Sequence, residues 1–226
     1  MKRTLSQEWL KAIACITMLV DHIGVVFFPR ILLFRIVGRI SFPIFCFLLA
    51  EGAVHTRNPK KYALRLLLGA ILSEFSYDYL FFGGITFRHQ NVMITLLIGF
   101  FMLRWMQRGN KLIPLALCMV LGKLLNADYG AWGVALIWVF GMTRTGKYRY
   151  LMQGLAMACI FLMMSSVKIQ LGFLKIPIQL FGLLAWIPIL LYSGKKLTHE
   201  KWLQWAFYLF YPAHLTILLA IVVITR

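Results

Sequence analysis

Asp21 and His22 are adjacent in the apolar run of residues 16–28, where burying a carboxylate or an imidazole costs free energy. A histidine has an unperturbed pKa of about 6.5, so His22 could act as a general base that takes a proton from an incoming nucleophile. On a helix Asp21 points about 100° away from His22, so it could orient the imidazole or pair with another helix. The alternative interpretation of His22 is a buried histidine satisfied by contacts between helices.

Lys11 precedes His22 by eleven residues. Eleven steps of 100° exceed three full turns by only about 20°, so the two side chains share one helix face, with Cys15 and Met18 between them. Their axial separation is roughly 16 Å, which places His22 near or just beyond the membrane midplane if Lys11 lies at the cytoplasmic interface. That spacing suits a donor such as coenzyme A, whose phosphates could bind at the surface while its flexible arm reaches into the membrane.

Arg39 opens the run Arg-Ile-Ser-Phe-Pro. Pro43 weakens the backbone hydrogen bonding there, and Arg39 supplies a fixed positive charge near the outer leaflet. It could pair with Asp21, Glu74 or Asp78 as a structural clamp. Equally, it could stabilise an anionic transition state, and both interpretations remain open.

A group of basic residues follows Glu51 at the other end of the same apolar segment. Arginine and lysine bind phosphate, so this group could hold the phosphates of a nucleotide-like donor. The alternative is a loop whose charges only fix membrane orientation, although one member lies a turn inside the next apolar segment. The members are Arg57, Lys60, Lys61 and Arg65.

Two acidic residues, Glu74 and Asp78, are four apart and therefore share a face of the third apolar segment. Such a pair could act as a proton reservoir or as a partner for Arg39 and His22. Asn91 leads directly into the fourth apolar segment, after a polar loop at which an acceptor could dock.

Tyr211 and His214 flank an intramembrane proline, Pro212, and are three residues apart on one helix face. Proline cannot donate a backbone hydrogen bond, so a local kink could open a cavity beside His214. A proline kink with a packed histidine is the alternative.

The elements that must position these residues are membrane helices. Hydrophobic residues make up 61% of the 226 and charged residues 14%, and several runs approach the roughly 20 apolar residues that cross a hydrocarbon core. We predict one all-α domain over residues 1–226, a polytopic membrane bundle of about nine helices. Two of them are short and could be tilted, or form a re-entrant pair around a turn at residues 128–130. The predicted spans are 9–28, 36–55, 62–82, 92–108, 112–126, 131–143, 150–166, 171–193 and 203–225.

The positive charges predict the orientation of the chain. Sixteen of the 24 Lys and Arg residues fall on the side of the N-terminus when span ends are assigned to alternate sides. The positive-inside rule then places the N-terminus in the cytoplasm, and an odd number of spans places the C-terminus outside. The formal charge of +17 is spread between apolar segments, which favours contact with membrane lipids and no nucleic-acid partner.

The four cysteines are far apart within apolar segments, so neither a disulfide framework nor a metal site is predicted. We therefore expect a multi-pass protein of a bacterial cytoplasmic membrane whose chemistry depends on the buried polar groups.

Several of these features recur as motifs: Lys11-x10-His22, Gly38-Arg39-x2-Phe42-Pro43-x-Phe45, the acidic third segment, Asn91, Tyr129-Gly130 and Phe210-Tyr211-x2-His214-Leu215. Together they resemble the TraX family, which is named for the membrane protein that acetylates conjugative pilin. The resemblance runs from about residue 8 to 216. TraX proteins are in turn similar to the acyltransferase-3 class of membrane enzymes, whose first helix carries Arg-x10-His.

The resemblance implies that His22 is catalytic and that an acetyl group passes from cytosolic acetyl-CoA to an acceptor on the outer side. Asp21 or Glu74 would orient His22, and Arg39 with Asn91 would position the reacting carbonyl. The acceptor would be a surface polymer, a lipid-linked glycan or a pilin-like protein.

Lys11 occupies the position of the arginine in that class and keeps its charge without its bidentate geometry. With it, the donor's phosphates would bind the four basic residues that follow Glu51. The residues expected to support the site or bind substrate are Glu51, Asp78, Asn91, Tyr129, Tyr211 and His214.

Two other functions remain open. A small proton-coupled transporter or flippase could use the same carboxylates and histidines, although the inverted repeat typical of such proteins is not evident in the sequence. A non-enzymatic assembly factor for surface structures would tolerate alanine at both Lys11 and His22.

Overall fold

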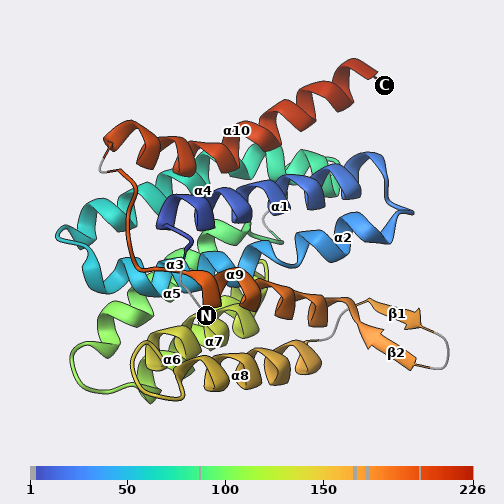
Figure 1. Cartoon of the computed structure of the whole chain (residues 1–226). Coiled ribbons are helices and arrows are strands. Elements are labelled where there is room, and N and C mark those ends of the chain that lie inside the picture. The colour runs from blue at the N-terminus through green and yellow to red at the C-terminus, as the bar shows by residue number, and fades with distance from the viewer. Residues whose placement is uncertain (1–3, 87, 165–166, 172–173, 199, 226) are drawn as a thin grey trace. The chain divides into compact units, whose positions relative to one another are not determined.

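The computed structural model describes residues 4–86, 88–164, 167–171, 174–198 and 200–225 (Figure 1). Helices predominate, which confirms the predicted all-α class, and the exception is one pair of short strands. The chain forms two compact units, Met1–Leu48 with Met142–His199 and Leu49–Gly141 with Glu200–Arg226. The single domain over residues 1–226 stays a prediction. Lys2, Arg3 and Arg226, which contributed to the predicted orientation, lie outside the described residues.

The first unit starts with a capped helix. Its elements are α1 (Gln7–Phe27), α2 (Leu32–Gly38), the first part of α3 (Ser41–His55), α8 (Arg149–Met163), β1 (Lys168–Leu171), β2 (Leu174–Pro177), η1 (Ile178–Ala185) and α9 (Trp186–Leu191). The Ser6 side chain accepts a hydrogen bond from the Trp9 backbone N–H at 3.3 Å, which satisfies one donor that the start of α1 leaves open. Leu5 pairs with Tyr192, so the N-terminal segment is held beside the end of α9.

Two glycines allow α2 to lie against α1. A Cβ atom at Gly24 would overlap the side chain of Phe34, and a Cβ atom at Gly38 would overlap the carboxylate of Asp21. Small residues permit this close approach of two helices. The contact fixes Asp21 against the end of α2.

The predicted helix at residues 36–55 is broken in the structure. α2 ends at Gly38 and α3 begins at Ser41, so Arg39 lies at the corner between them. Pro43 falls in the first turn of α3, where its missing N–H removes no intrahelical hydrogen bond. Proline therefore marks the start of a new helix and not a weak point inside a continuous one.

The prediction of a helix over residues 171–193 was wrong at its beginning. β1 and β2 form an antiparallel hairpin in which Lys168 lies opposite Pro177, and a 3₁₀-helix follows. Polar and apolar residues alternate along β1 and through the first three residues of β2. This period of two fits a strand, whereas mean hydropathy does not detect it.

The second unit is organised around one long helix. Its elements are the rest of α3, α4 (Pro59–Phe82), α5 (Val92–Met106), α6 (Leu112–Leu124), α7 (Gly130–Met142) and α10 (Lys201–Thr225). The Asn58 side chain accepts a hydrogen bond from the Lys61 backbone N–H at 3.0 Å and so caps α4. Tyr62 stacks on Phe100 of α5, with ring centroids 4.7 Å apart. Further along, α4 contacts α10, and the hydroxyl groups of Ser76 in α4 and Thr216 in α10 are hydrogen-bonded at 2.9 Å.

These contacts give the second unit two chemically different ends. The start of α4 meets the end of α5, and the later part of α4 meets the start of α5, where Asn91 donates to the Ala70 carbonyl at 2.9 Å. We name the first the basic end; it carries Arg57, Lys60, Lys61, Arg104 and Arg108. We name the second the acidic end; it carries Glu74, Asp78, Asn91 and Asp128.

Three helical stretches among the described residues are long and apolar enough to cross a membrane: Gln7–Phe27, Leu32–His55, which takes α2 and α3 together across their corner, and Trp202–Thr225. The other apolar helices are shorter, and α6 and α7 have 13 residues each, about 20 Å against a hydrocarbon core of about 30 Å. Apolar membrane helices are thus confirmed, whereas the count of nine spans and the cytoplasmic N-terminus stay predictions.

Candidate functional site

Asp21 is the centre of a buried ion cluster in the first unit. Its Oδ2 accepts a hydrogen bond from Arg39 Nη2 at 2.6 Å and another from Arg35 Nη1 at 2.9 Å. The Arg39 side chain is 7% exposed and also donates from Nε to the Arg35 carbonyl at 3.2 Å. Of the partners predicted for Arg39, Asp21 is the one with which the structure pairs it.

In this cluster one carboxylate faces two guanidinium groups. Among the described residues, no donor lies within hydrogen-bonding distance of the buried Asp21 Oδ1. Guanidinium groups favour an anionic group nearby, such as the oxyanion that develops on a carbonyl under attack. Arg35 was not predicted as a site residue, although its spacing of four from Arg39 places both on one face of a helix.

His22 lies on the protein-facing side of α1. The residues between it and Lys11 on the predicted stripe, Cys15 and Met18, are buried, whereas Ile16 on the opposite side is exposed. Lys11 and His22 are themselves half-buried. The predicted common face therefore points into the first unit, and a passage that joins Lys11 to His22 stays a prediction.

Asn91 organises the acidic end of the second unit. It is fully buried, and its Nδ2 donates to the Ala70 carbonyl at 2.9 Å and to Glu74 Oε2. Its Oδ1 accepts from the Met93 backbone N–H at 3.0 Å and caps α5. Because both amide protons of Asn91 are already donated, the side chain positions Glu74 and caps a helix.

The carboxylates of the acidic end have too few hydrogen-bond donors. Asp78 is 1% exposed; its Oδ2 accepts from the Thr86 backbone N–H at 2.8 Å. Within the described residues, Asp78 Oδ1 and Glu74 Oε1 are buried without a hydrogen-bond partner. Buried carboxyl oxygens without donors indicate a proton, an ordered water or a bound group at this place.

Two tyrosines lie beside these acids. Tyr77 is within electrostatic range of Glu74, Asp78 and Asp128, and Tyr211 is buried and hydrogen-bonds the backbone of Val92. Tyr211 was predicted as a supporting residue. Tyr77 was not, because an aromatic residue in an apolar helix gives no distinctive signal in sequence.

Tyr129 shapes the turn that carries Asp128. It has a positive φ of 63°, which is rare for a residue with a side chain, and Gly130 follows with 46°. The turn is held to the start of α5 because the Asp128 backbone N–H donates to the Gln90 carbonyl at 2.9 Å and Thr95 donates to the Asp128 carbonyl. The left-handed backbone of Tyr129 therefore turns the chain between Asp128 and α7, and its supporting role stays a prediction.

His214 is a packed histidine in α10. It is buried, its Nδ1 donates to the Phe210 carbonyl at 2.7 Å, and its ring stacks on that of Phe210 at 4.9 Å. α10 continues through Pro212. These contacts favour the packing interpretation of His214 over a catalytic one.

A profile of the TraX protein family matches residues 6–222. The chain belongs to the TraX family. The match extends over both units and includes Asp21, His22 and Arg39 in the first and Glu74 and Asn91 in the second.

Two curated relatives of this TraX-family chain are informative. A probable fimbrial assembly protein FimC, serogroup H1, of Dichelobacter nodosus is 30% identical over 233 residues, 92% of either chain. An uncharacterized protein of Rickettsia prowazekii (strain Madrid E) is 32% identical over 97 residues, 43% of this chain and 36% of that protein. No solved structure matches.

The residues predicted to bind the donor differ in their surroundings in this TraX-family structure. Arg57, Lys60 and Lys61 are exposed at the basic end. Arg65 is half-buried, with its guanidinium carbon 5.0 Å from the ring centre of Tyr208 and 5.7 Å from that of Tyr62. Arg65 therefore packs as a cation against two aromatic faces, whereas the other three are accessible to an anion.

Glu51, predicted as a supporting residue, is half-buried near the end of α3. Its backbone carbonyl accepts a hydrogen bond from the ring of His55 at 2.8 Å.

The described residues contain no group of three or more His, Cys, Asp or Glu side chains arranged to hold a metal ion.

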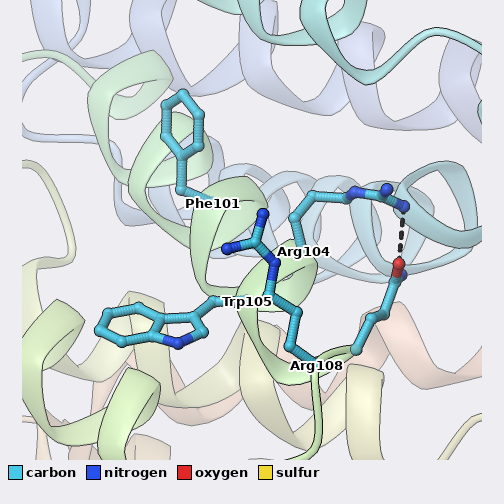
Figure 2. Close-up of a pocket in the computed structure, with 5 residues that line it drawn as sticks. Phe101, Arg104, Trp105 and Arg108 are labelled. Carbon is cyan, nitrogen blue, oxygen red and sulfur yellow. Dashed lines mark hydrogen bonds between the residues drawn. The ribbon is translucent and has the colours of Figure 1, made fainter.

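A pocket at the end of α5 was not predicted from the sequence. It has a volume of about 370 Å³ and is lined by Phe101, Arg104, Trp105, Gln107 and Arg108 (Figure 2). Its arginines were interpreted only as charges that set membrane orientation. Their four-residue spacing, with an aromatic residue three positions before each, is the signal that could have revealed it.

Proposed function

We propose that this TraX-family protein is an integral-membrane acyltransferase of the bacterial cytoplasmic membrane. It would move an acetyl group from cytosolic acetyl-CoA to an acceptor on the outer side. The observation that supports this most strongly is the α1 stripe: Lys11 and His22 lie on the protein-facing side of a membrane helix, next to the buried cluster of Asp21 with two arginines. Ionisable groups at such depth are costly and usually functional.

In the proposed step an acceptor hydroxyl or amine attacks the thioester carbonyl while its proton passes to the imidazole of His22. The new C–O or C–N bond forms, the C–S bond breaks, and the leaving thiolate of coenzyme A takes the proton from His22. The guanidinium groups of Arg35 and Arg39 beside Asp21 would stabilise the oxyanion. Lys11 would contact the donor's phosphates.

The acidic end of the second unit has groups that could bind a hydroxyl or ammonium group. Glu74 and Asp78 offer buried oxygens that lack donors, and the polar loop before Asn91 is close to them in sequence. A hydroxyl or ammonium group of the acceptor would supply those donors. The Dichelobacter nodosus relative is named a probable fimbrial assembly protein, which makes a pilin-like protein one acceptor class to test.

The test is transfer of radiolabelled acetyl-CoA into envelope fractions by membrane vesicles from cells that express the protein. We expect His22→Gln to reduce the incorporated label by at least ~100-fold, the scale of a lost general base. His55→Gln is the matched control, because glutamine can still donate to the Glu51 carbonyl, and should keep wild-type incorporation. Equal labelling with His22→Gln would overturn the proposal.

A transporter is the second candidate, because Glu74 Oε1 and Asp78 Oδ1 are the kind of buried carboxyl oxygens that carry protons in transporters. Proton-driven uptake by proteoliposomes without acetyl-CoA, lost in Asp78→Asn, would favour it. Full envelope modification with alanine at both Lys11 and His22 would favour a non-enzymatic assembly factor.

A further inference from the structure

The end of α5 combines exposed aromatic rings with arginine on one face. Phe101, Trp105 and Arg108 are four and three residues apart, so they form one stripe along the helix. Figure 2 shows the Arg108 side chain turned back along α5 toward Phe101 and Trp105, as side chains on a helix tend to point. The guanidinium and the two aromatic rings therefore line the same pocket.

Both rings are open to the surroundings. Phe101 is 56% exposed and Trp105 is 42% exposed. On a membrane helix, exposed apolar rings meet acyl chains, and tryptophan prefers the level of the headgroups. Arg108 follows Phe101 by seven residues, about 10 Å further along the axis, which is the direction from acyl chain to headgroup.

The positive charge of the pocket has no acidic partner among the described residues. Arg104 donates from Nη1 to Gln107 Oε1 at 2.6 Å and to the Ala53 carbonyl at 3.2 Å, both of which are neutral acceptors. Arg57, Lys60 and Lys61 lie at the same basic end. An anionic ligand would neutralise this charge, and phosphate oxygens match the hydrogen-bonding geometry of guanidinium groups.

We propose that this pocket binds the phosphodiester headgroup of an anionic phospholipid. The phosphate would lie against Arg108 and Arg104, Trp105 would lie at the glycerol level, and an acyl chain would cover Phe101. The combination of exposed rings and guanidinium on one stripe favours a lipid over a water-soluble phosphate, which gains nothing from Phe101. The site does not depend on acyl transfer.

The test is a binding titration of the purified full-length protein, held in neutral detergent, with short-chain phosphatidylglycerol followed by native mass spectrometry. We expect saturable binding that Arg108→Gln weakens by about tenfold, the scale of one charge-assisted hydrogen bond. Arg108→Lys keeps the charge and should weaken it less. Arg88→Gln removes an exposed arginine at the other end of the unit and should leave binding unchanged.

Other phosphate-containing ligands that could occupy the pocket are distinguished by competition. Phosphatidylcholine of the same chain length should bind much more weakly, and glycerol phosphate should not displace phosphatidylglycerol. Displacement by glycerol phosphate would instead indicate a free phosphate site, and displacement by coenzyme A would indicate part of the donor site. Either displacement, or an equal effect of Arg108→Gln and Arg88→Gln, would overturn the proposal.

Discussion

At the scale of single residues, Asp21 is the residue of the first unit whose substitution should affect stability most. Its carboxylate is paired with two guanidinium groups that differ in burial. The Arg39 side chain is 7% exposed and that of Arg35 is 31% exposed. A buried charge that loses its partner is strongly destabilising, whereas an ion pair open to solvent contributes little. The three side chains should therefore respond differently to substitution.

We predict that Asp21→Asn destabilises the protein by about 3 kcal/mol or more, because it leaves a buried guanidinium without a counter-charge. Arg35→Gln should cost only about 1 kcal/mol, since that side chain is partly solvated. Unfolding titrations in mixed micelles measure both. In the double variant Asp21→Asn with Arg39→Met, part of the loss should be recovered; a double variant no more stable than Asp21→Asn alone would contradict the ion-cluster interpretation.

Residue by residue, the sequence could predict which side chains share a helix face better than which groups they contact. The spacing of Lys11 and His22 fixed a common face because both lie on one helix. The pairing of Asp21 with Arg35 could not be predicted in the same way, because it depends on how closely α2 approaches α1. Asn91 was expected to hold a reacting carbonyl, yet its donors are used by Ala70 and Glu74.

At the scale of elements, the approach of α1 and α2 depends on Gly38. Any Cβ at this position would overlap the Asp21 carboxylate, so the helix pair and the ion cluster are one structural feature. Gly38 was noted in sequence only as part of a motif, and its close contact becomes evident only when both helices are in place.

We predict that Gly38→Ala lowers both stability and acetyl transfer, although alanine normally favours a helix by about 1 kcal/mol over glycine. The added methyl group must displace Asp21 from Arg39 or separate the two helices. Thermal unfolding and the vesicle labelling assay measure the two effects. Gly84→Ala is the matched control because open space surrounds that glycine; equal results for the two variants would show that Gly38 is not a tight contact.

At the scale of the whole molecule, hydropathy predicted the position of nearly every helix, but it did not predict the structure of residues 168–191. The hairpin there alternates polar and apolar residues, and the helical part that follows has 8 residues of 3₁₀-helix and 6 of α-helix. At the rise per residue of a 3₁₀-helix and of an α-helix, these two segments together are roughly 25 Å long. This is slightly short of a hydrocarbon core of about 30 Å. Composition alone cannot distinguish a crossing from a re-entrant segment of this length.

The side on which the C-terminus lies tests this segment. If α6 and α7 form a re-entrant pair, the chain crosses the membrane two times fewer, and the C-terminus stays on the same side. If the segment of η1 and α9 does not cross, the chain crosses one time fewer, and the C-terminus moves to the opposite side. With nine spans, or with seven, a cytoplasmic N-terminus places the C-terminus outside.

We therefore predict that alkaline phosphatase fused after the C-terminal residue is active, because this enzyme folds only on the outer side of the membrane. Green fluorescent protein fused at the same place should be dark, because it becomes fluorescent only in the cytoplasm. Fusions after Asn110, between α5 and α6, follow four predicted spans and should give the reverse pattern. If the Asn110 fusions behave as expected but the C-terminal fusions report the cytoplasm, η1 and α9 do not cross. The last helix then runs inward, whereas the outer side predicted for the acidic end of α4 and α5 is unchanged, because that end precedes Asn110.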